Sequence, residues 1–268
     1  MLTLTAGPAA LRVDRARGGR LASLVVHGHE LLVRPEPDRP HDPLLTGSYP
    51  MAPFAGRLRG GRFRWGGAVH QLPANHGGHA IHGTTFDTRW LIEHAERDYL
   101  RIRSRLDPEW PFPGWAIQEL ALNAERLELR LEVHATDLPF PATAGWHPWF
   151  RRRLEVGGPA EVQFDAKRWY PLGIDGLPTG DLEPVPLART WDDCFTSITW
   201  PVTVTWPGAL ELQITATCDH LVVYDALPDA LCVEPQTGPP DAANLALARL
   251  VRRHDPLIVE AEMRWRVP

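Results

Sequence analysis

The sequence predicts an all-β fold, built as a large antiparallel β-sandwich or barrel with few short helical turns. Apolar and polar residues alternate along many short segments, which is the pattern of strands that bury one face. No window of about 12 residues keeps a helical period between capping residues, and strands do not alternate with helices along the chain. Sandwiches of 268 residues commonly form one domain, so we expect a single domain over residues 1–268.

The clearest strand is predicted over residues 126–136, RLELRLEVHAT. Leu127, Leu129 and Leu131 face one way there, and the charged residues between them face the other. The same alternation predicts strands over residues 99–106, 198–206, 209–216 and 261–267. Pro201 lies inside one of these segments, and because proline cannot donate to a ladder it indicates a sheet edge or a bulge.

Glycine and proline mark the connections between these strands. Residues 66–67, Gly-Gly, predict a tight hairpin, and residues 207–208 predict a turn. The best helical candidate, residues 241–254, is short, so we expect at most one helical turn there. Residues 169–195 are unusually long for a connection without structure, and we expect this segment to lie over a pocket.

Composition excludes several classes of function. The net charge is −5 and basic residues are scattered along the chain, so no footprint for nucleic acid or an anionic membrane is visible, and we expect a small partner. The start of the chain lacks the pattern of a secretion signal and no stretch reaches about 18 apolar residues, which predicts a cytoplasmic protein. Cys194, Cys218 and Cys232 form no CxxC pair, so we expect reduced thiols that serve packing.

Residues 75–86, NHGGHAIHGTTF, place three histidines at even spacing and raise the question of a metal site. His76, His79 and His82 would share a face only on a helix, and the glycines between them make a helix improbable. No nearby carboxylate completes a set of ligands. We therefore expect no metal here, and we interpret His76 and His79 as loop residues without an assigned role.

Four widely separated stretches combine a reactive side chain with glycine or proline. They carry Arg57, His82, His147 and Glu234. His147 and Glu234 each precede a proline, which holds their backbone extended and aims the side chain. A histidine and a glutamate can form an acid–base pair, and loops that are distant in sequence commonly meet in one site.

Over nearly its full length the chain resembles the aldose 1-epimerase (galactose mutarotase) family. Seven stretches occur in the family's order: GGRLASLVVHGHELL, PFAGRL, IHGTTF, GWHPWF, LPTGDLEPV, DDCF and VEPQTGPPDAAN. GWHPWF and VEPQT are the most specific of them. The resemblance implies the large galactose mutarotase-like supersandwich and an enzyme that interconverts the α and β anomers of a free hexose or a related sugar.

The resemblance implies that Glu234 is the general base of this reaction and His147 the general acid. The base takes the proton of the C1 hydroxyl while the acid protonates the ring oxygen, and the open aldehyde rotates and recloses. This chemistry needs no cofactor and no metal, and it leads us to expect Glu234 ionised and His147 protonated near neutral pH. Trp146 and Trp149 could stack on the sugar, and we expect at least one of them in the core.

The resemblance also implies residues that bind the sugar. Arg57 and His82 would hold sugar oxygens, and an aspartate of DDCF would bind a hydroxyl. The family motif places that aspartate on Asp192, with Asp193 as the alternative. Gln236, in EPQT, is a weaker candidate for the pocket.

Two other functions stay open at the level of sequence. The substrate could be a hexose 6-phosphate, with Arg59, Arg62, Arg89 and residues 151–153 as possible phosphate ligands. Alternatively, the same fold could bind sugar without catalysis. The identity of the sugar and the oligomeric state do not follow from the sequence.

Overall fold

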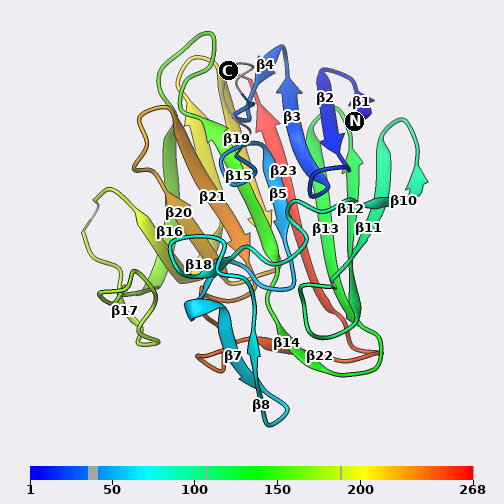
Figure 1. Cartoon of the computed structure of the whole chain (residues 1–268). Helices are drawn as coiled ribbons and strands as arrows, with labels where there is room; N and C mark the ends of the chain where they lie inside the picture. Colours follow the sequence, from blue (N-terminus) through cyan, green and yellow to red (C-terminus); the bar gives the residue numbers. More distant parts are fainter. Residues whose placement is uncertain (36–41, 107, 188, 268) are drawn as a thin grey trace.

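The computed structural model describes residues 1–35, 42–106, 108–187 and 189–267, and its regular secondary structure consists almost entirely of β-strands (Figure 1). The strands are β1 (Leu2–Ala6), β2 (Ala9–Asp14), β3 (Arg20–Val26), β4 (His29–Glu30), β5 (Ser48–Met51), β6 (Arg57–Leu58), β7 (Arg62–Trp65), β8 (Ala68–Gln71), β9 (Ala80–Ile81), β10 (Leu91–Ala95), β11 (Tyr99–Arg105), β12 (Gly114–Leu122), β13 (Arg126–Ala135), β14 (Phe140–Ala142), β15 (Gly145–Arg151), β16 (Glu161–Tyr170), β17 (Glu183–Pro184), β18 (Asp192–Trp206), β19 (Leu210–Ala216), β20 (His220–Tyr224), β21 (Ala230–Gln236), β22 (Arg249–Val251) and β23 (Leu257–Arg266). The predicted all-β fold is therefore confirmed.

The five predicted strands are all present, with shifted ends. Residues 126–136 and 99–106 match β13 and β11 closely, and 209–216 matches β19. Residues 198–206 lie within β18 and residues 261–267 overlap β23 up to Arg266, and both strands start earlier than the alternation suggested. Along β13 the predicted inward leucines are buried, so alternation identified the faces of the strands as well as their positions.

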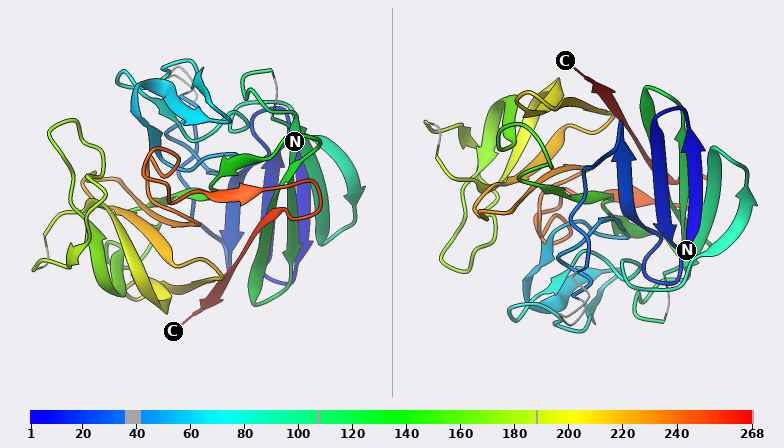
Figure 2. Two further views of the ribbon diagram at one scale, coloured as in Figure 1. Left: turned by 90° about the horizontal axis from the view of Figure 1, so that it is seen from below. Right: turned by 90° about the horizontal axis from the view of Figure 1, so that it is seen from above.

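The strands form two layers that share one long strand. In the first layer the order is β1-β2-β3-β5-β15-β21-β20-β18, and in the second it is β18-β19-β23-β13-β12-β11-β10, with every pairing antiparallel. Strand β18 joins them, because residues 192–196 pair with β20 and residues 202–206 pair with β19. Strands β1–β3 and β11–β13 lie close together in both views of Figure 2. The sheet therefore folds back on itself as a sandwich.

Pro201 lies where β18 passes from one layer to the other. The register between β16 and β18 shifts between Gln163 and Asp165, so three residues of β18, including Pro201, lie opposite a single residue of β16. No ladder partner is lost to the proline there, which confirms the predicted bulge.

The core fills the space between the layers and is held by apolar contacts and a few buried hydrogen bonds. The indole of Trp146, on β15, donates to Gln118 Oε1 on β12 at 3.0 Å. Gln118 in turn donates to the carbonyl of Gly19 at 2.8 Å, so one buried amide connects three segments. Because side chains alternate along β15, Trp146 and Phe150 face this core and His147 and Trp149 face the opposite side.

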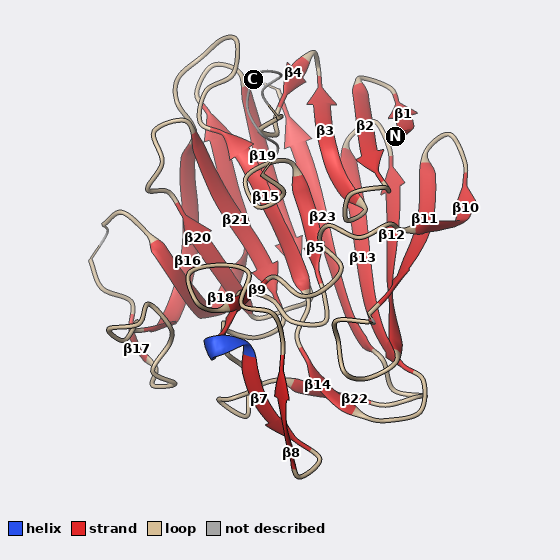
Figure 3. Ribbon diagram, in the orientation of Figure 1, coloured by secondary structure: helices blue, strands red, loops and turns tan. Residues whose placement is uncertain are grey.

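Helical structure is scarce, as predicted. One 3-10 helix, η1 (Arg59–Gly61), lies beside β7 (Figure 3). Residues 241–254, the best helical candidate, form hydrogen-bonded turns and β22 instead, because the segment is too short to bury a helical face. In the ranges that the structure describes, no helix is long and apolar enough to span a bilayer.

The predicted turns are confirmed. β7 and β8 pair as a hairpin that projects from one end of the molecule (Figure 1). Gly66 and Gly67 form its two-residue turn with φ of 58° and 81°, the positive values that such turns require. Gly208, also at positive φ, reverses the chain between β18 and β19.

Candidate active site

His147 and Glu234 meet on the face of the first layer that points away from the core. β15 pairs with β21 through Gly145↔Gln236 and Trp149↔Cys232, so this register places His147 directly opposite Glu234. Their Nε2 and Oε1 atoms are 3.3 Å apart, and only 8% and 4% of the two side chains are exposed. Gly145 permits the close approach of the strands, because a Cβ there would meet the carbonyl of Pro235.

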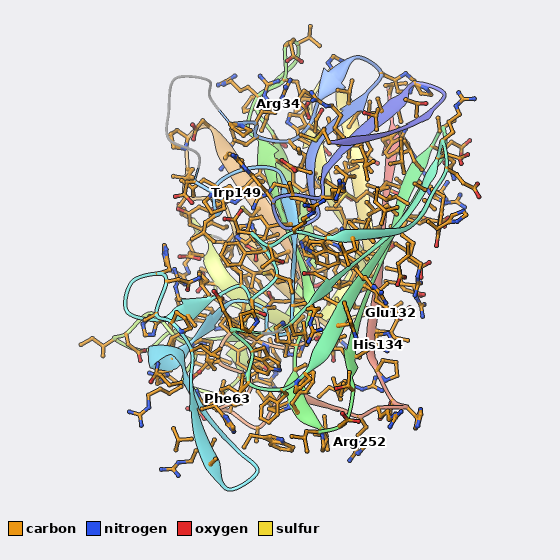
Figure 4. The ribbon with its side chains drawn as sticks, turned by 45° about the vertical axis from the view of Figure 1, so that its right-hand side comes forward. Arg34, Phe63, Glu132, His134, Trp149 and Arg252 are labelled. Atoms are coloured by element: carbon orange, nitrogen blue, oxygen red, sulfur yellow. The ribbon has the colours of Figure 1, made fainter. Side chains whose placement is uncertain are left out.

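The imidazole of His147 contacts two aromatic rings. Tyr49, on β5, stacks on it with ring centroids 4.9 Å apart, and Trp149 stacks on it at 5.1 Å. The Tyr49 hydroxyl and the Trp149 indole N–H both donate to the carbonyl of Leu44, at 3.1 and 2.6 Å. The expectation that at least one of the two tryptophans lies in the core is confirmed by Trp146, whereas Trp149 (Figure 4) lines the cavity.

Substituting Tyr49 tests whether its ring supports His147. Tyr49→Phe should lower the free energy of unfolding by about 0.5–1.5 kcal/mol, because it removes one buried hydrogen bond. Tyr49→Leu should cost more, because it also removes a ring stack that is worth about 0.5–1.5 kcal/mol and leaves a cavity. Urea unfolding of both variants measures this difference. Equal losses would show that the ring contributes nothing beyond its hydroxyl.

His82 approaches the pair from a loop that follows β9. Its ring lies edge-on to His147, with centroids 4.7 Å apart and an interplanar angle of 86°. The backbone of His82 has a positive φ of 59°, and its N–H donates to the carbonyl of Gly56 at 2.9 Å. Gly83 follows in the same left-handed region, where a Cβ would meet the carbonyl of Ala52. This strained turn aims the imidazole toward the cavity, which His82 lines.

Arg57 brings a permanent positive charge to the same place. It lies on β6, opposite Ile81 of β9, and lines the cavity. Among the described residues its guanidinium has no hydrogen bond or ion pair, whereas Arg59, two positions along, pairs with Asp175 and Asp241. Arg57 is therefore available to a ligand and Arg59 is not.

The strand register distinguishes Asp192 from Asp193. Asp192 pairs with Tyr224, which pairs with Cys232, so its side chain lies on the same face as Glu234. Asp193 points the other way, is 3% exposed, and accepts a hydrogen bond from Arg189 Nη2 at 2.7 Å. This arrangement favours Asp192 as the sugar ligand, the first of the two sequence alternatives.

A cavity of about 240 Å³ brings these residues together. Its lining includes Arg57, His82, His147, Asp192 and Glu234. The segment 169–195 contributes Leu172 and Gly176 as well as the aspartates, which confirms that it lies over a pocket. Gln236 is not part of the lining, because its side chain is fully buried and its amide donates to the carbonyl of Gly238 at 2.8 Å.

Two of the three histidines of residues 75–86 line the cavity, and the third anchors the loop. His76 and His79 form an isolated bridge closed by Gly77 and Gly78, both at positive φ. His79 Nδ1 accepts the backbone N–H of Gly60 at 3.1 Å, which fixes the loop to η1. His76 lines the cavity together with His82. Sequence reasoning left His76 without a role, although its Gly-Gly neighbour already indicated a tight turn that could return the chain to the site.

Burial governs the ionisation of the pair. It raises the pKa of Glu234 well above the usual value, an effect that Asp192 increases and Arg57 opposes. It lowers the pKa of His147 to about 3. The structure therefore favours a protonated Glu234 beside a neutral His147. These pKa directions oppose the expected ionised glutamate and protonated histidine, because a buried charge loses its hydration.

Burial also keeps His82 neutral. It lowers the pKa of His82 well below the usual value, and the neighbouring His147 and Arg57 lower it further. His82 Nδ1 has no hydrogen-bond partner among the described residues, and neither has His147 Nδ1. A neutral imidazole can both donate and accept, so His82 suits a sugar hydroxyl.

Comparisons with known proteins agree with this architecture. The protein YihR of Escherichia coli K12, itself uncharacterized, is 25% identical over 259 residues, which is 87% of this chain and 83% of that protein. A galactose mutarotase-like protein from Clostridium acetobutylicum matches with a TM-score of 0.88 at 14% identity, over 99% of this chain and 95% of its own. Galactose 1-epimerase from Lactobacillus acidophilus matches with a TM-score of 0.79 at 18% identity, over 98% of this chain and 93% of its own. These structures confirm the supersandwich fold. The family model of aldose 1-epimerase matches residues 2–244, and the chain therefore belongs to the aldose 1-epimerase family.

Proposed function

We propose that this protein is an aldose 1-epimerase that interconverts the anomers of a free hexose or a closely related sugar. The observation that carries the proposal is the buried His147–Glu234 pair, 3.3 Å apart in the wall of the cavity. The cavity, about 240 Å³, is smaller than typical pockets of about 300–1,000 Å³ for drug-sized ligands. It therefore suits one monosaccharide.

The pair can carry both proton transfers of ring opening. Glu234 takes the proton of the C1 hydroxyl while His147 gives a proton to the ring oxygen, and the C1–O5 bond breaks to leave the open aldehyde. After rotation about C1–C2, His147 takes back the proton of the O5 hydroxyl and Glu234 returns its proton to O1. The protons balance over the cycle, and the base and the acid exchange roles on reclosure.

The ionisation that burial favours has a place in this cycle. Once the ring is open, Glu234 is protonated and His147 is neutral, which is the state that the pKa directions favour. Burial therefore destabilises the ionised pair relative to the neutral pair that exists beside the open sugar. The positive charge of Arg57 lowers the pKa of Glu234 and so stabilises the ionised carboxylate that starts the reaction.

The charges of the lining favour an uncharged sugar over a hexose 6-phosphate. Within the described ranges, Arg57 is the one arginine or lysine of the lining, whereas Asp192, Asp193 and Glu234 are acidic. Among the arginines considered for phosphate, Arg151 pairs with Glu155 and Arg152 donates to backbone carbonyls. Asp193 is paired with Arg189 and the raised pKa of Glu234 favours its neutral form, so a phosphate dianion would meet one cation, Arg57, opposed by Asp192.

Exchange between anomers tests the proposal directly. Polarimetry or NMR exchange should show faster interconversion of glucose, galactose or a related aldose with protein than with buffer. Faster turnover of the 6-phosphate than of the free sugar would overturn the substrate class. Calorimetric binding of a sugar without any exchange would instead identify a catalytically silent sugar-binding protein.

Arg57→Ala should mainly weaken substrate binding. We expect KM to rise by about tenfold or more, because a hydrogen bond to a charged group is worth roughly 1.5–3 kcal/mol. Initial rates against sugar concentration measure this, and Arg62→Ala, an exposed arginine on β7, is the matched control. An unchanged KM would remove Arg57 from the binding site.

A further inference from the structure

Cys232 lies beside the proposed acid–base pair, and the reaction gives its thiol no role. It precedes Glu234 by two positions on β21, so both side chains point to the same face of the strand. Potential ligand atoms of His147, Cys232 and Glu234 all lie within 4.8 Å of one another, and all three residues are buried. In the part of the chain that the structure describes, this is the one group of His, Cys, Asp or Glu that could hold a metal ion.

We propose that His147, Cys232 and Glu234 bind a thiophilic divalent cation of the Zn²⁺ class, and that the bound cation excludes the sugar from the pair. Tetrahedral zinc, with Zn–N and Zn–O near 2.0–2.2 Å and Zn–S near 2.3 Å, separates its ligand atoms by about 3.3–3.6 Å. His147 Nε2 and Glu234 Oε1 already lie 3.3 Å apart. The sulfur of Cys232 lies within 4.8 Å of a ligand atom of each of them, so a small approach of the three side chains would complete the tetrahedral spacing.

The donor set selects the class of cation. One sulfur, one imidazole nitrogen and one carboxylate oxygen suit Zn²⁺ and similar soft ions, whereas Mg²⁺ and Ca²⁺ prefer oxygen ligands alone. Three protein ligands leave a fourth tetrahedral position, and because His147 and Glu234 line the cavity that position can open toward it. Binding would release the thiol proton, and any carboxyl proton, to solvent. The thiolate and the carboxylate then balance the charge of the ion, which removes the cost of burying it unpaired.

The same atoms cannot serve the metal and the sugar at once. Zinc on His147 Nε2 and on the Glu234 carboxylate occupies the acid and the base of the proposed reaction. The cation is therefore an inhibitor and not a cofactor. The protein should be fully active without metal, so a chelator should not lower its activity. This inhibition rests on the proposed function, whereas binding of the cation does not.

Binding of Co²⁺ and Zn²⁺ tests the site without reference to activity. Protein without an affinity tag is treated with EDTA to remove metal, and the EDTA is then removed. Binding of Co²⁺ is followed by absorption spectroscopy, and binding of Zn²⁺ by calorimetry. We expect one equivalent of Co²⁺ to give the absorption band of a cobalt–thiolate bond. Cys232→Ser should abolish the band and weaken Zn²⁺ binding by at least about tenfold, since even loss of an outer-shell partner costs about 10- to 100-fold.

The control is Cys218→Ser, which removes another buried thiol that is not part of the group and should bind Co²⁺ as the wild type does. Absence of a thiolate band in the wild type would overturn the proposal, as would an unchanged band in Cys232→Ser. Zinc held only by surface histidines would leave Cys232→Ser and wild type alike. If Cys232→Ser does not fold, as judged by thermal unfolding, Cys232→Ala takes its place.

Anomer exchange at increasing Zn²⁺ concentration then tests whether the bound cation excludes the sugar. Zinc should inhibit wild type and Cys218→Ser reversibly with EDTA, and inhibition of Cys232→Ser should need at least about tenfold more zinc. If the metal-free wild type shows no exchange, the proposed function fails while the binding result stands. Tight binding in the cobalt and zinc titrations with uninhibited exchange would instead refute the exclusion of the sugar.

Discussion

Glu234→Gln is expected to lower the turnover of sugar anomers by about two to four orders of magnitude, the usual contribution of general acid–base catalysis. The amide keeps the size of the carboxylate but cannot take the C1 hydroxyl proton. It also keeps most of the polar contacts, so sugar affinity should change little. NMR exchange of a hexose with and without the variant measures the rate, and calorimetry measures the affinity.

The stability of the same variant provides an independent check. Because the pKa of Glu234 is raised in the folded protein, its stabilising contribution is complete below the unfolded pKa and is lost as pH rises through the folded pKa. The glutamine does not titrate, so Glu234→Gln should gain thermal stability relative to wild type as pH rises. Glu161→Gln, at an exposed position of β16, should show neither effect. Near-wild-type turnover by folded Glu234→Gln would place the base on another residue.

Local patterns in the sequence were sufficient to predict the fold class and the strand faces. Alternation in residues 126–136 requires only that every second side chain is buried, and β13 obeys it. Pro201 was predicted to lie at a bulge or an edge, because proline has no backbone N–H to donate to a neighbouring strand. Residues 241–254 were expected to hold at most one helical turn, and they form hydrogen-bonded turns, because a short helical pattern cannot outweigh turns that connect packed strands.

The site depended on pairings that no local pattern contains. Cross-strand register brings His147 against Glu234, and the alternation of β18 separates Asp192 from Asp193, a choice that the sequence left open. Gln236 shares a short motif with Glu234, yet its side chain ends on the carbonyl of Gly238. The sequence also could not give the direction of the pKa shifts of the pair, because the burial that causes them arises only after the sheets pack.

The pH dependence of His147→Asn should separate the two members of the pair. In wild type we expect a bell-shaped profile, since the pair must carry one proton in all, and both gain of a second proton and loss of the last one stop the reaction. With the pKa of Glu234 raised and that of His147 lowered to about 3, the last proton leaves Glu234, so the alkaline limb reports the carboxyl group.

Asparagine cannot donate a proton to the ring oxygen as imidazolium does, so the rate of His147→Asn should fall by about two to four orders of magnitude. The residual reaction needs only ionised Glu234. Its rate should therefore rise through the raised pKa of the carboxyl group and stay high at alkaline pH, where the wild-type rate declines. Rates of anomer exchange from pH 5 to 10, corrected for buffer, give both profiles. A residual bell in His147→Asn would show that a second group, with His82 as the nearest candidate, supplies the acid.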